Sequence, residues 1–428
     1  MRSRRRRKLD EEKAHLARRI RRLVRRMPVK MTEVDFAHEP QAEPVPFRYG
    51  TVRILVRLAG APVGYLNLLN RGDGLSAGGL RRAAAQWLGS TTWANALRSR
   101  WNDGAPHSTL ASDRLPISVI VCTRGRSKLL AGCLDTLARQ SYSDFEVIVV
   151  DNAPTDDSTR LVAESYSTRY VLEPRPGLDW ARNAGWRAAR SPIVAYIDDD
   201  ARADPDWLQG IAGGFTAPEV HAVTGLVVAA ELETVAQRIF EYQYGGMGKG
   251  FRSLIHSSRG RTLVHRPHQY GVGCNMAFRK SALLAIGGFD PALDVGTPTG
   301  GGGDLDVFQR IVEADGAIVY RPDAIVRHIH RRSMRQLRRQ VFDNGRGYGA
   351  TFTAMLLRAR GRARLGVLHS WSLWWGYYFV IRLIRWAIRL ERLPLRLILI
   401  ELAGFAIGPF LYPAVRRKAD KLRSHEEP

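Results

Sequence analysis

Short apolar runs alternate with amphipathic segments through the middle of the chain. The apolar runs are rich in β-branched residues and too short for buried helices, which is typical of buried strands. The strands are predicted over 117–122, 145–150, 170–172 and 193–197, and the helices over 127–140 and 178–189. Strands that are apolar throughout and separated by helices predict an α/β fold, with a mostly parallel sheet covered by helices on both faces.

Polar side chains follow three of these strands directly. They are Thr123 and Arg124 after the first strand, Asp151 after the second, and Asp198, Asp199 and Asp200 after the fourth. In an open α/β sheet, ligands bind beyond the carboxyl ends of the parallel strands. We therefore expect the three clusters to converge on one ligand-binding crevice.

The three adjacent aspartates indicate a metal site. Like charges in a row repel one another unless a cation lies among them. Because side chains alternate along a strand, Asp198 and Asp200 are expected on one face and Asp199 on the other. Two carboxylates at this spacing suit a hard divalent cation. The alternative is a solvated turn that caps the next helix, and the neighbouring polar clusters favour the metal site.

The second half of the chain contains the glycine-rich segment GTPTGGGGDLDVFQR. It is not a phosphate-binding P-loop, because no Gly-Lys-Ser/Thr follows the glycines. It predicts a loop that leads into a helix starting near Asp304. Asp304 and Asp306 lie in the first turn, where the helix dipole favours carboxylates, so capping is an alternative to a chemical role. His328 and His330 share a face of a later strand-like stretch, and either suits a carboxylate metal site.

Together these segments resemble the family-2 glycosyltransferases with the GT-A fold, over roughly residues 115–330. The resemblance rests on the order and spacing of PISVIVCTRGR, FEVIVVDNAPTDDST, GLDWARNAG before IVAYIDDD, and GGGGDLDVFQR before a late histidine. It implies an inverting enzyme that moves a sugar from a nucleotide-sugar donor to an acceptor hydroxyl. The alternatives are a nucleotidyltransferase acting on sugar phosphates and a catalytically inactive scaffold of the same fold.

The resemblance implies a role for each matching residue. The residues expected to bind substrate are Thr123, Arg124, Asp151, Arg182, Asn183, Asp198 and Asp199. The expected ligands of Mn²⁺ or Mg²⁺ are Asp198, Asp200 and His328, with His330 as the substitute for His328. Asp304 is expected to be the general base that takes a proton from the acceptor hydroxyl.

The sequence departs from the family's pattern in two places. Gly303 stands where the family has the first acid of a pair, which leaves the base assignment to Asp304 alone. The Gln-x-x-Arg-Trp element of the processive members does not follow residue 330. We therefore expect the transfer of one sugar per encounter rather than polymerisation.

The charge of the chain lies in its flanks. The formal net charge of +24 divides into +13 for residues 1–112, −3 for residues 113–330 and +14 for residues 331–428. Such flanks fit an anionic membrane surface or nucleic acid, but the slightly acidic middle argues against nucleic-acid binding at the site. The three cysteines lack paired spacing, which favours a reducing compartment over a disulfide framework or a zinc site.

These patterns predict four parts of the chain. Residues 1–46 are expected to form a basic amphipathic helix and a linker, 47–113 a small accessory module, 114–335 the catalytic domain, and 336–428 a membrane-associated helical region. The membrane association would place the enzyme on the cytoplasmic face of the cell membrane, as a peripheral or monotopic protein. Its acceptor would then be a lipid-linked or envelope glycan. The oligomeric state is not predicted.

The C-terminal part is rich in leucine and aromatic residues but interrupted by arginines. Arg382, Arg385, Arg389 and Arg396 recur at helical steps beside apolar residues, which predicts helices lying in the membrane interface. The alternative is that these helices pack on the catalytic domain or form a dimer interface. Residues 397–415 are more apolar but contain Glu401 and Pro409, so the pattern leaves open whether this segment spans a membrane.

Overall fold

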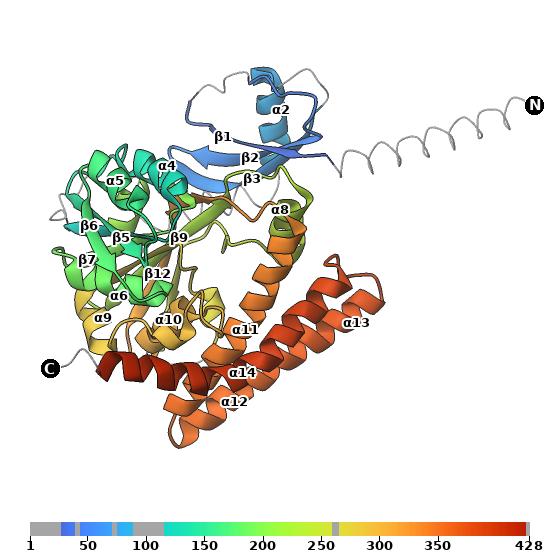
Figure 1. Cartoon of the computed structure of the whole chain (residues 1–428). Coiled ribbons are helices and arrows are strands. Elements are labelled where there is room, and N and C mark those ends of the chain that lie inside the picture. The colour runs from blue at the N-terminus through green and yellow to red at the C-terminus, as the bar shows by residue number, and fades with distance from the viewer. Residues whose placement is uncertain (1–26, 39–42, 71–74, 89–114, 259–264, 425–428) are drawn as a thin grey trace, which may run out of the picture. The chain divides into compact units, whose positions relative to one another are not determined.

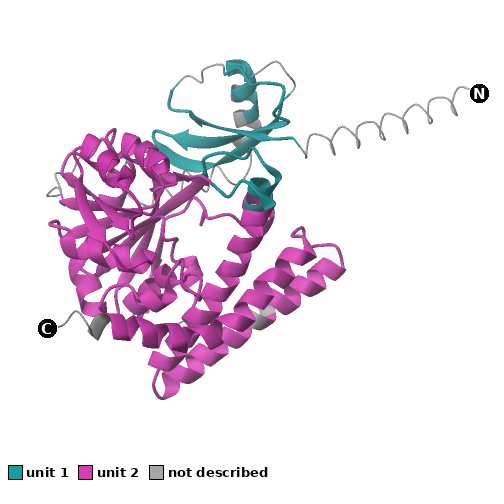
Figure 2. Ribbon diagram, in the orientation of Figure 1, with its two compact units in different colours: residues 1–107, 229–240, 330–334 teal, residues 108–228, 241–329, 335–428 magenta. Residues whose placement is uncertain are grey.

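The structure is a computed structural model that describes residues 27–38, 43–70, 75–88, 115–258 and 265–424 (Figure 1). The basic amphipathic helix predicted near the N-terminus lies outside the described residues. The chain forms two compact units (Figure 2). The first comprises residues 1–107, 229–240 and 330–334, and the second comprises residues 108–228, 241–329 and 335–428.

The first unit is built on a three-stranded sheet. Its elements are β1 (Val29–Asp35), β2 (Thr51–Leu58), β3 (Ala61–Leu69), α2 (Ala77–Leu88) and the short α8 (Val235–Ile239). Strand β2 pairs in parallel with β1 and antiparallel with β3. Val52, Ile54 and Val56 share one face of β2 because side chains alternate along a strand, and they pack with Leu66 and Leu80.

Strand β1 corrects the linker that the sequence predicted after the N-terminal helix. Residues 29–35 pair one for one with β2, from Val29 opposite Thr51 to Asp35 opposite Arg57. The carboxylate of Asp35 also accepts the backbone N–H groups of Ala59 and Gly60. Residues 29–35 form a strand because they pair with β2, and the composition of the segment alone does not predict this pairing. The accessory module therefore begins near residue 29 rather than at residue 47.

The second unit contains a nine-stranded sheet whose first strands are parallel. The elements are β4 (Ile117–Thr123), α4 (Ser127–Leu137), β5 (Phe145–Asn152), α5 (Ser158–Ser165), β6 (Arg169–Glu173), α6 (Leu178–Ala188) and β7 (Ile193–Ile197). Strand β4 pairs in parallel with β5 and β7, and β5 with β6. The α/β fold predicted from the hydrophobic pattern is confirmed, and its carboxyl strand ends meet at one edge.

The remaining strands make the sheet mixed. They are β8 (Ala201–Ala203), β9 (Val220–Ala229), β10 (Leu254–His256), β11 (Asn275–Arg279) and β12 (Ala317–His328). Strand β11 lies antiparallel between β7 and β9, and β12 pairs antiparallel with β8 and β10. The helices of this half are α7 (Trp207–Ala212), α9 (Lys280–Ile286) and α10 (Gly303–Glu313). The antiparallel pairings thus involve β8, β10 and β11, for which the sequence predicted no strands.

Helices cover both faces of this sheet. Val119 of β4 packs toward Leu130 and Trp207 in one buried cluster. Its neighbour Ile120 packs toward Trp186 and Phe308 in a second buried cluster. Because neighbouring strand residues point to opposite faces, the uninterrupted apolar sequence of β4 supplies both cores.

Four helices complete the second unit. They are α11 (Met334–Arg358), α12 (Arg362–Trp375), α13 (Arg382–Ala387) and α14 (Leu395–Ser424), and a π-helical turn (Gly376–Ile381) joins α12 to α13. Figure 1 shows them in orange and red. Helix α14 continues through Pro409 and Pro413. It contains a 28-residue segment, Leu395–Leu422, that is long and apolar enough to cross a membrane.

Helices α11 and α14 contact each other through their backbones. Gly345 and Gly349 of α11 and Gly404 and Gly408 of α14 each lie against the other helix. A Cβ atom at any of the four would collide with a backbone carbonyl oxygen of that helix. Two glycines one turn apart on each helix therefore permit the close approach, as small residues do between packed helices.

The buried Arg382 corrects one feature of the predicted basic face. Its guanidinium lies 3.5 Å from the Glu391 carboxylate and 3.3 Å from the Glu401 carboxylate, and the residue is only 7% exposed. Glu401 is held in turn by the Tyr244 hydroxyl at 2.6 Å. Arg385, Arg389 and Arg396 are exposed, as predicted. Arg382 is thus an internal counterion of α14 and does not face solvent.

Candidate active site

The polar clusters predicted at the strand ends come together in the second unit. Thr123 ends β4 and donates a hydrogen bond from its hydroxyl to Asp199 Oδ2 at 2.7 Å. Arg126 Nη1 lies 3.0 Å from Asp199 Oδ1 and 3.4 Å from Asp200 Oδ2. The first and fourth strands therefore deliver one connected cluster of carboxylates and a cation. Asp151 pairs with Thr123 across the ladder between β5 and β4.

The three aspartates follow the strand rather than continue it, yet Asp198 and Asp200 both lie near His328 while Asp199 binds Thr123. Strand β7 ends at Ile197, so Asp198, Asp199 and Asp200 lie in the turn that follows, where the two-residue repeat no longer applies. Arg126 contacts both Asp199 and Asp200, which places these two neighbours around one guanidinium. Burial raises the pKa of Asp199 to about 6, although Arg126 lowers it.

Arg126 is the arginine of the first cluster that reaches the aspartates. Arg124, which the sequence assigned to substrate binding, is exposed at the end of β4. The residue between them, Gly125, has φ +61° and turns the chain there. The segment CTRGRS contains both arginines. The sequence therefore showed that Arg126 was available, but it did not show the turn that brings Arg126 to the aspartates.

The structure gathers a candidate metal site. One ligand atom from each of Asp198, Cys274 and His328 lies within 4.8 Å of the other two. Asp200 Oδ1 is 3.2 Å from His328 Nε2. Two carboxylates and an imidazole suit Mn²⁺ or Mg²⁺. Burial raises the pKa of the Cys274 thiol, and a neutral thiol is not a ligand for a hard cation.

His328 rather than His330 belongs to this cluster. His328 ends β12, whose pairing with β8 brings it opposite Ala201, directly after the aspartates. His330 lies in the first unit, where its ring packs edge-on against Phe240 with 4.8 Å between the ring centroids. The choice of His328 as the expected ligand therefore agrees with the side chains that the structure brings together.

Helix α6 contributes a buried arginine to the same place. Arg182 Nη1 donates to Asp179 Oδ1 at 3.0 Å, and both residues are almost fully buried. Burial opposes the charge on this guanidinium, but Asp179, Asp198 and Asp304 raise the pKa of Arg182. The Arg182 guanidinium is permanently charged and lies among carboxylates. It is therefore suited to binding an anionic ligand that arrives together with a cation.

Asn183, also assigned to substrate binding, makes its contacts within the protein. Its amide nitrogen donates to the Phe289 carbonyl at 2.9 Å. Its Oδ1 accepts the Phe289 backbone N–H at 2.9 Å and the Trp186 indole N–H at 3.0 Å. These contacts fix the loop before residue 290 against α6.

Asp151 is fully buried at the end of β5. It accepts a hydrogen bond from the Tyr170 hydroxyl at 3.0 Å. Burial raises the pKa of Asp151, and the hydrogen bond from Tyr170 opposes that rise. The pairing of β5 with β6 supplies Tyr170, so this support for Asp151 depends on the parallel sheet.

Asp304 lies in the first turn of α10, as predicted, and close to Arg182. A Cβ atom placed on Gly273 would be 2.7 Å from Arg182 Nη2 and 3.0 Å from Asp304 Oδ2. Both side chains therefore pass over the same glycine, just before Cys274 of the metal cluster. The absence of a side chain at Gly273 leaves room for both charged groups near the same backbone.

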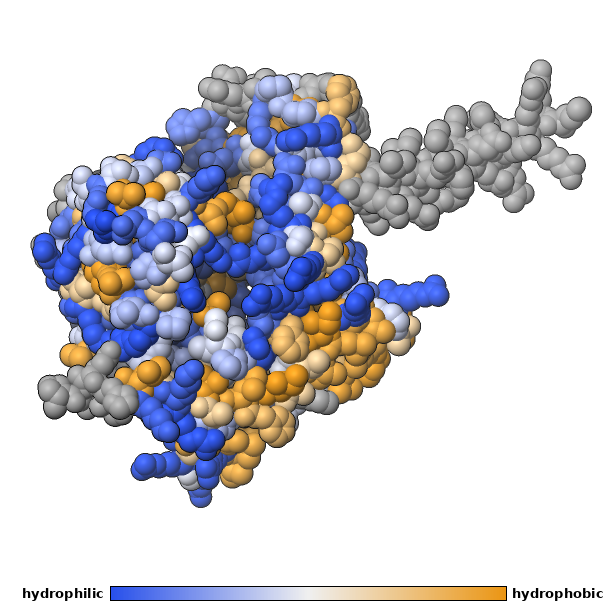
Figure 3. Space-filling view, viewed as in Figure 1, coloured by the Kyte–Doolittle hydropathy of each residue, from blue (hydrophilic) through white to orange (hydrophobic). Residues whose placement is uncertain are grey.

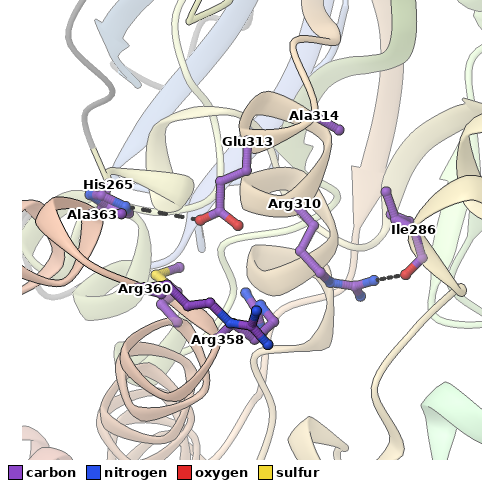
Figure 4. A pocket seen from close by; sticks show the side chains of 10 residues that line it. His265, Ile286, Arg310, Glu313, Ala314, Arg358, Arg360 and Ala363 are labelled. Carbon is purple, nitrogen blue, oxygen red and sulfur yellow. Dashed lines mark hydrogen bonds and ion pairs between the residues drawn. The ribbon is translucent and has the colours of Figure 1, made fainter.

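A cavity of about 610 Å³ lies away from these residues, along the second half of α10 (Figure 4). Arg310 and Arg358 line it, and they bind the buried Asp306 carboxylate at 2.7 Å and 2.6 Å. Glu313, which like Arg310 belongs to α10, points toward His265 across the cavity. Asp306 is thus bound by two arginines of the cavity, which indicates a structural role for the Asp306–Arg310 pair.

Comparisons with known proteins indicate the class of protein to which the chain is similar. Residues 118–287 match the model of the family Glycosyl transferase family 2. The match spans the first two strand ends, the three aspartates and Cys274. It favours the glycosyltransferase prediction over the nucleotidyltransferase alternative.

Two curated relatives carry related names. The Pre-mycofactocin glycosyltransferase of Mycobacterium tuberculosis is 30% identical over 210 residues, which cover 48% of this chain and 42% of the relative. The Glucosyl-dolichyl phosphate glucuronosyltransferase of Haloferax volcanii is 26% identical over 229 residues, 50% of this chain and 69% of the relative. The chain thus spans less than half the length of the mycobacterial relative.

Solved structures are also similar. A mannosyltransferase from Pyrobaculum calidifontis, in complex with GDP-Man and Mn²⁺, has a TM-score of 0.42 and 18% identity over 78% of this chain and 82% of that one.

Proposed function

We propose that the protein is a metal-dependent, inverting glycosyltransferase. It moves one sugar at a time from a nucleotide-sugar donor to a hydroxyl group of an envelope or lipid-linked glycan. The observation that carries the proposal is the convergence of Asp198, Asp200 and His328 near Arg182 and Asp304. Asp198, Asp200 and Arg182 belong to the segment that matches Glycosyl transferase family 2. Such a site offers a cation-binding end for a diphosphate and a carboxylate for an acceptor hydroxyl.

The donor would bind across the strand ends. Asp151 and Thr123 stand at the ends of β5 and β4, where a nucleoside reaches the sheet of an α/β fold. Mn²⁺ or Mg²⁺, held by Asp198, Asp200 and His328, would neutralise charge on the leaving diphosphate. Arg182 adds a second, permanent positive charge beside the same aspartates.

Asp304 would act on the acceptor. Its carboxylate, at the start of α10, accepts the proton of the hydroxyl group that attacks the anomeric carbon. Attack opposite the leaving diphosphate inverts the configuration at that carbon. The reach of Asp304 toward Arg182 over Gly273 supports this role, because it places the base next to the charge that binds the leaving group.

The test is nucleotide release from a panel of nucleotide sugars, with candidate glycan acceptors, in Mn²⁺ and in chelator. We expect release from one donor that needs the metal and is lost in Asp200→Ala. Glu164→Gln, which removes an exposed carboxylate on α5, is the matched control and should keep wild-type activity. Turnover that survives both the chelator and Asp200→Ala would contradict the metal-dependent mechanism.

We propose further that the protein docks in the plane of the cytoplasmic leaflet. Large apolar residues are exposed along the C-terminal helices, and Figure 3 shows this apolar surface over them. The most exposed include Leu365, Ile388, Leu390 and Phe410. Exposed arginines lie beside them on α13 and before α14. An apolar surface bordered by arginines fits an anionic lipid surface.

A further inference from the structure

Gly303 and Asp179 occupy one space. Helix α10 begins at Gly303, directly before Asp304. A Cβ atom at Gly303 would overlap the carboxylate of Asp179, with the Asp179 Cγ only 2.6 Å away. Gly303 has an ordinary helical backbone, so alanine there would meet no conformational strain. The absence of a side chain at residue 303 is therefore what makes room for Asp179.

The protein holds the Asp179 carboxylate at this place. Asp179 lies in the first turn of α6, where its backbone N–H and that of Leu178 donate to the Asp294 carboxylate at 2.8 Å and 2.6 Å. Asp179 is 1% exposed. Its Oδ1 accepts from Arg182, whereas Oδ2, the oxygen next to Gly303, has no hydrogen-bond partner among the described residues. Burying such an oxygen is costly, so its position needs a reason.

Arg182 supplies that reason. One end of its guanidinium is bound by Asp179, and Nη2 at the other end lies over Gly273 beside Asp304. A buried arginine has several rotamers, and the contact with Asp179 selects the one that points between Asp198 and Asp304. That is the place where the leaving diphosphate and the acceptor hydroxyl would meet.

We propose that Asp179 is a positioning residue that aims Arg182 into the donor site from the space that Gly303 leaves open. The carboxylate missing at residue 303 is thus replaced by one from α6. This inference rests on the proposed glycosyltransferase function. The inference implies that a side chain at residue 303 and the Asp179 carboxylate cannot both occupy this space. A side chain at 303 would displace the carboxylate and release Arg182.

A double-mutant cycle tests this coupling. The four proteins are the wild type, Asp179→Ala, Gly303→Ala and the double variant, each with donor KM, kcat and thermal unfolding measured. Each single variant should raise the donor KM about tenfold, because a charge-assisted hydrogen bond that orients Arg182 is lost. In the Asp179→Ala background, Gly303→Ala should have less than a twofold further effect, because no carboxylate remains to be displaced. Gly376→Ala, where a Cβ meets open space on a helix, is the control and should keep the wild-type KM.

The outcomes separate this inference from the proposed function. Turnover by the wild type with additive effects of the two substitutions overturns the inference and leaves the function standing. An unchanged donor KM in Asp179→Ala overturns it as well. If the wild type binds and turns over no nucleotide sugar, the function fails and the role of Asp179 in donor binding fails with it. Non-additive effects of Asp179→Ala and Gly303→Ala on the unfolding temperature would then show only that residues 179 and 303 are in steric contact.

Discussion

At the scale of single residues, Asp304 is the group whose loss should affect chemistry more than binding. It lies in the first turn of α10, and its carboxylate and the Arg182 guanidinium both lie near Gly273. We expect Asp304→Asn to lower kcat roughly 1000-fold, because general-base catalysis contributes on this order, with the donor dissociation constant nearly unchanged. Single-turnover kinetics and donor titration would measure the two effects. Comparable losses of binding and kcat would argue that Asp304 holds the donor instead.

At the same scale, the buried Glu401 should make stability depend on pH. Burial raises the pKa of Glu401 from 4.5 to about 7, although Tyr244 and Arg382 lower it. A carboxyl group with a raised pKa in the folded state stabilises the fold below its unfolded pKa, and this stabilisation is lost as pH rises through the folded value. Between about pH 4.5 and pH 7 the loss is at most about 3 kcal/mol.

Glu401→Gln tests this pH dependence, because the amide does not titrate. Measured by urea unfolding, the variant should be less stable than the wild type at pH 5, and the difference should shrink as the pH rises to 8. Glu164→Gln, on the exposed face of α5, should show no such trend. A difference that is constant between pH 5 and pH 8 would contradict the raised pKa.

At the scale of secondary structure elements, the glycine contacts between α11 and α14 should limit substitution. A Cβ atom at Gly408 would lie against the Arg346 carbonyl oxygen and 2.8 Å from the Ala350 nitrogen, and neither backbone atom can move alone. We expect Gly408→Ala to destabilise the protein by about 1–3 kcal/mol, the usual cost of overpacking. Chemical denaturation of this variant and of Gly376→Ala would compare a closed site with an open one. Equal stabilities would mean that the two helices separate without cost.

The elements that the sequence predicted well are those whose signal is local. Strands β4, β5 and β7 are continuous apolar runs, and the residues at their ends follow from the rule that parallel strands share one edge. Strand β1 was missed because its pairing with β2 is tertiary. The contact of Arg126 with the aspartates depends on the turn at Gly125, and the substrate-binding role of Arg124 stays a prediction. The contact of Asp179 with Gly303 joins residues more than one hundred positions apart, and no local pattern carries it.

At the scale of the whole molecule, the basic flanks have a physical counterpart in the described C-terminal helices. Arg382 is internal, but Arg385, Arg389 and Arg396 remain exposed near Ile388 and Leu390. Helix α14 is also bound to the rest of the second unit at residues outside its glycine contacts. Tyr412 and Arg416 bind the Asp290 carboxylate at 2.8 Å and 3.0 Å. A helix bound at these points to the rest of the second unit is poorly suited to crossing a bilayer by itself, which supports the proposed docking in the interface plane.

This arrangement predicts how the protein meets a membrane. The protein should sediment with vesicles containing phosphatidylglycerol and much less with pure phosphatidylcholine, because the exposed arginines favour anionic lipid. Replacing Ile388, Leu390 and Phe410 together by serine should weaken vesicle binding more than tenfold, since each removes exposed apolar surface that would enter the interface. Leu161→Ser, an exposed leucine on α5, is the control and should bind as the wild type does.

The proposed docking also predicts the side of the membrane on which the C-terminus lies. If α14 stays in the interface with the catalytic unit, a peptide tag after residue 428 should be cleaved by protease added to inverted membrane vesicles, whose cytoplasmic face is outside. If α14 crosses the bilayer, the tag is protected in these vesicles until detergent is added. A protected tag would overturn in-plane docking. In that case α14 would have to separate from Asp290 and from the glycines of α11. Gly408→Ala would then no longer destabilise the protein in membranes.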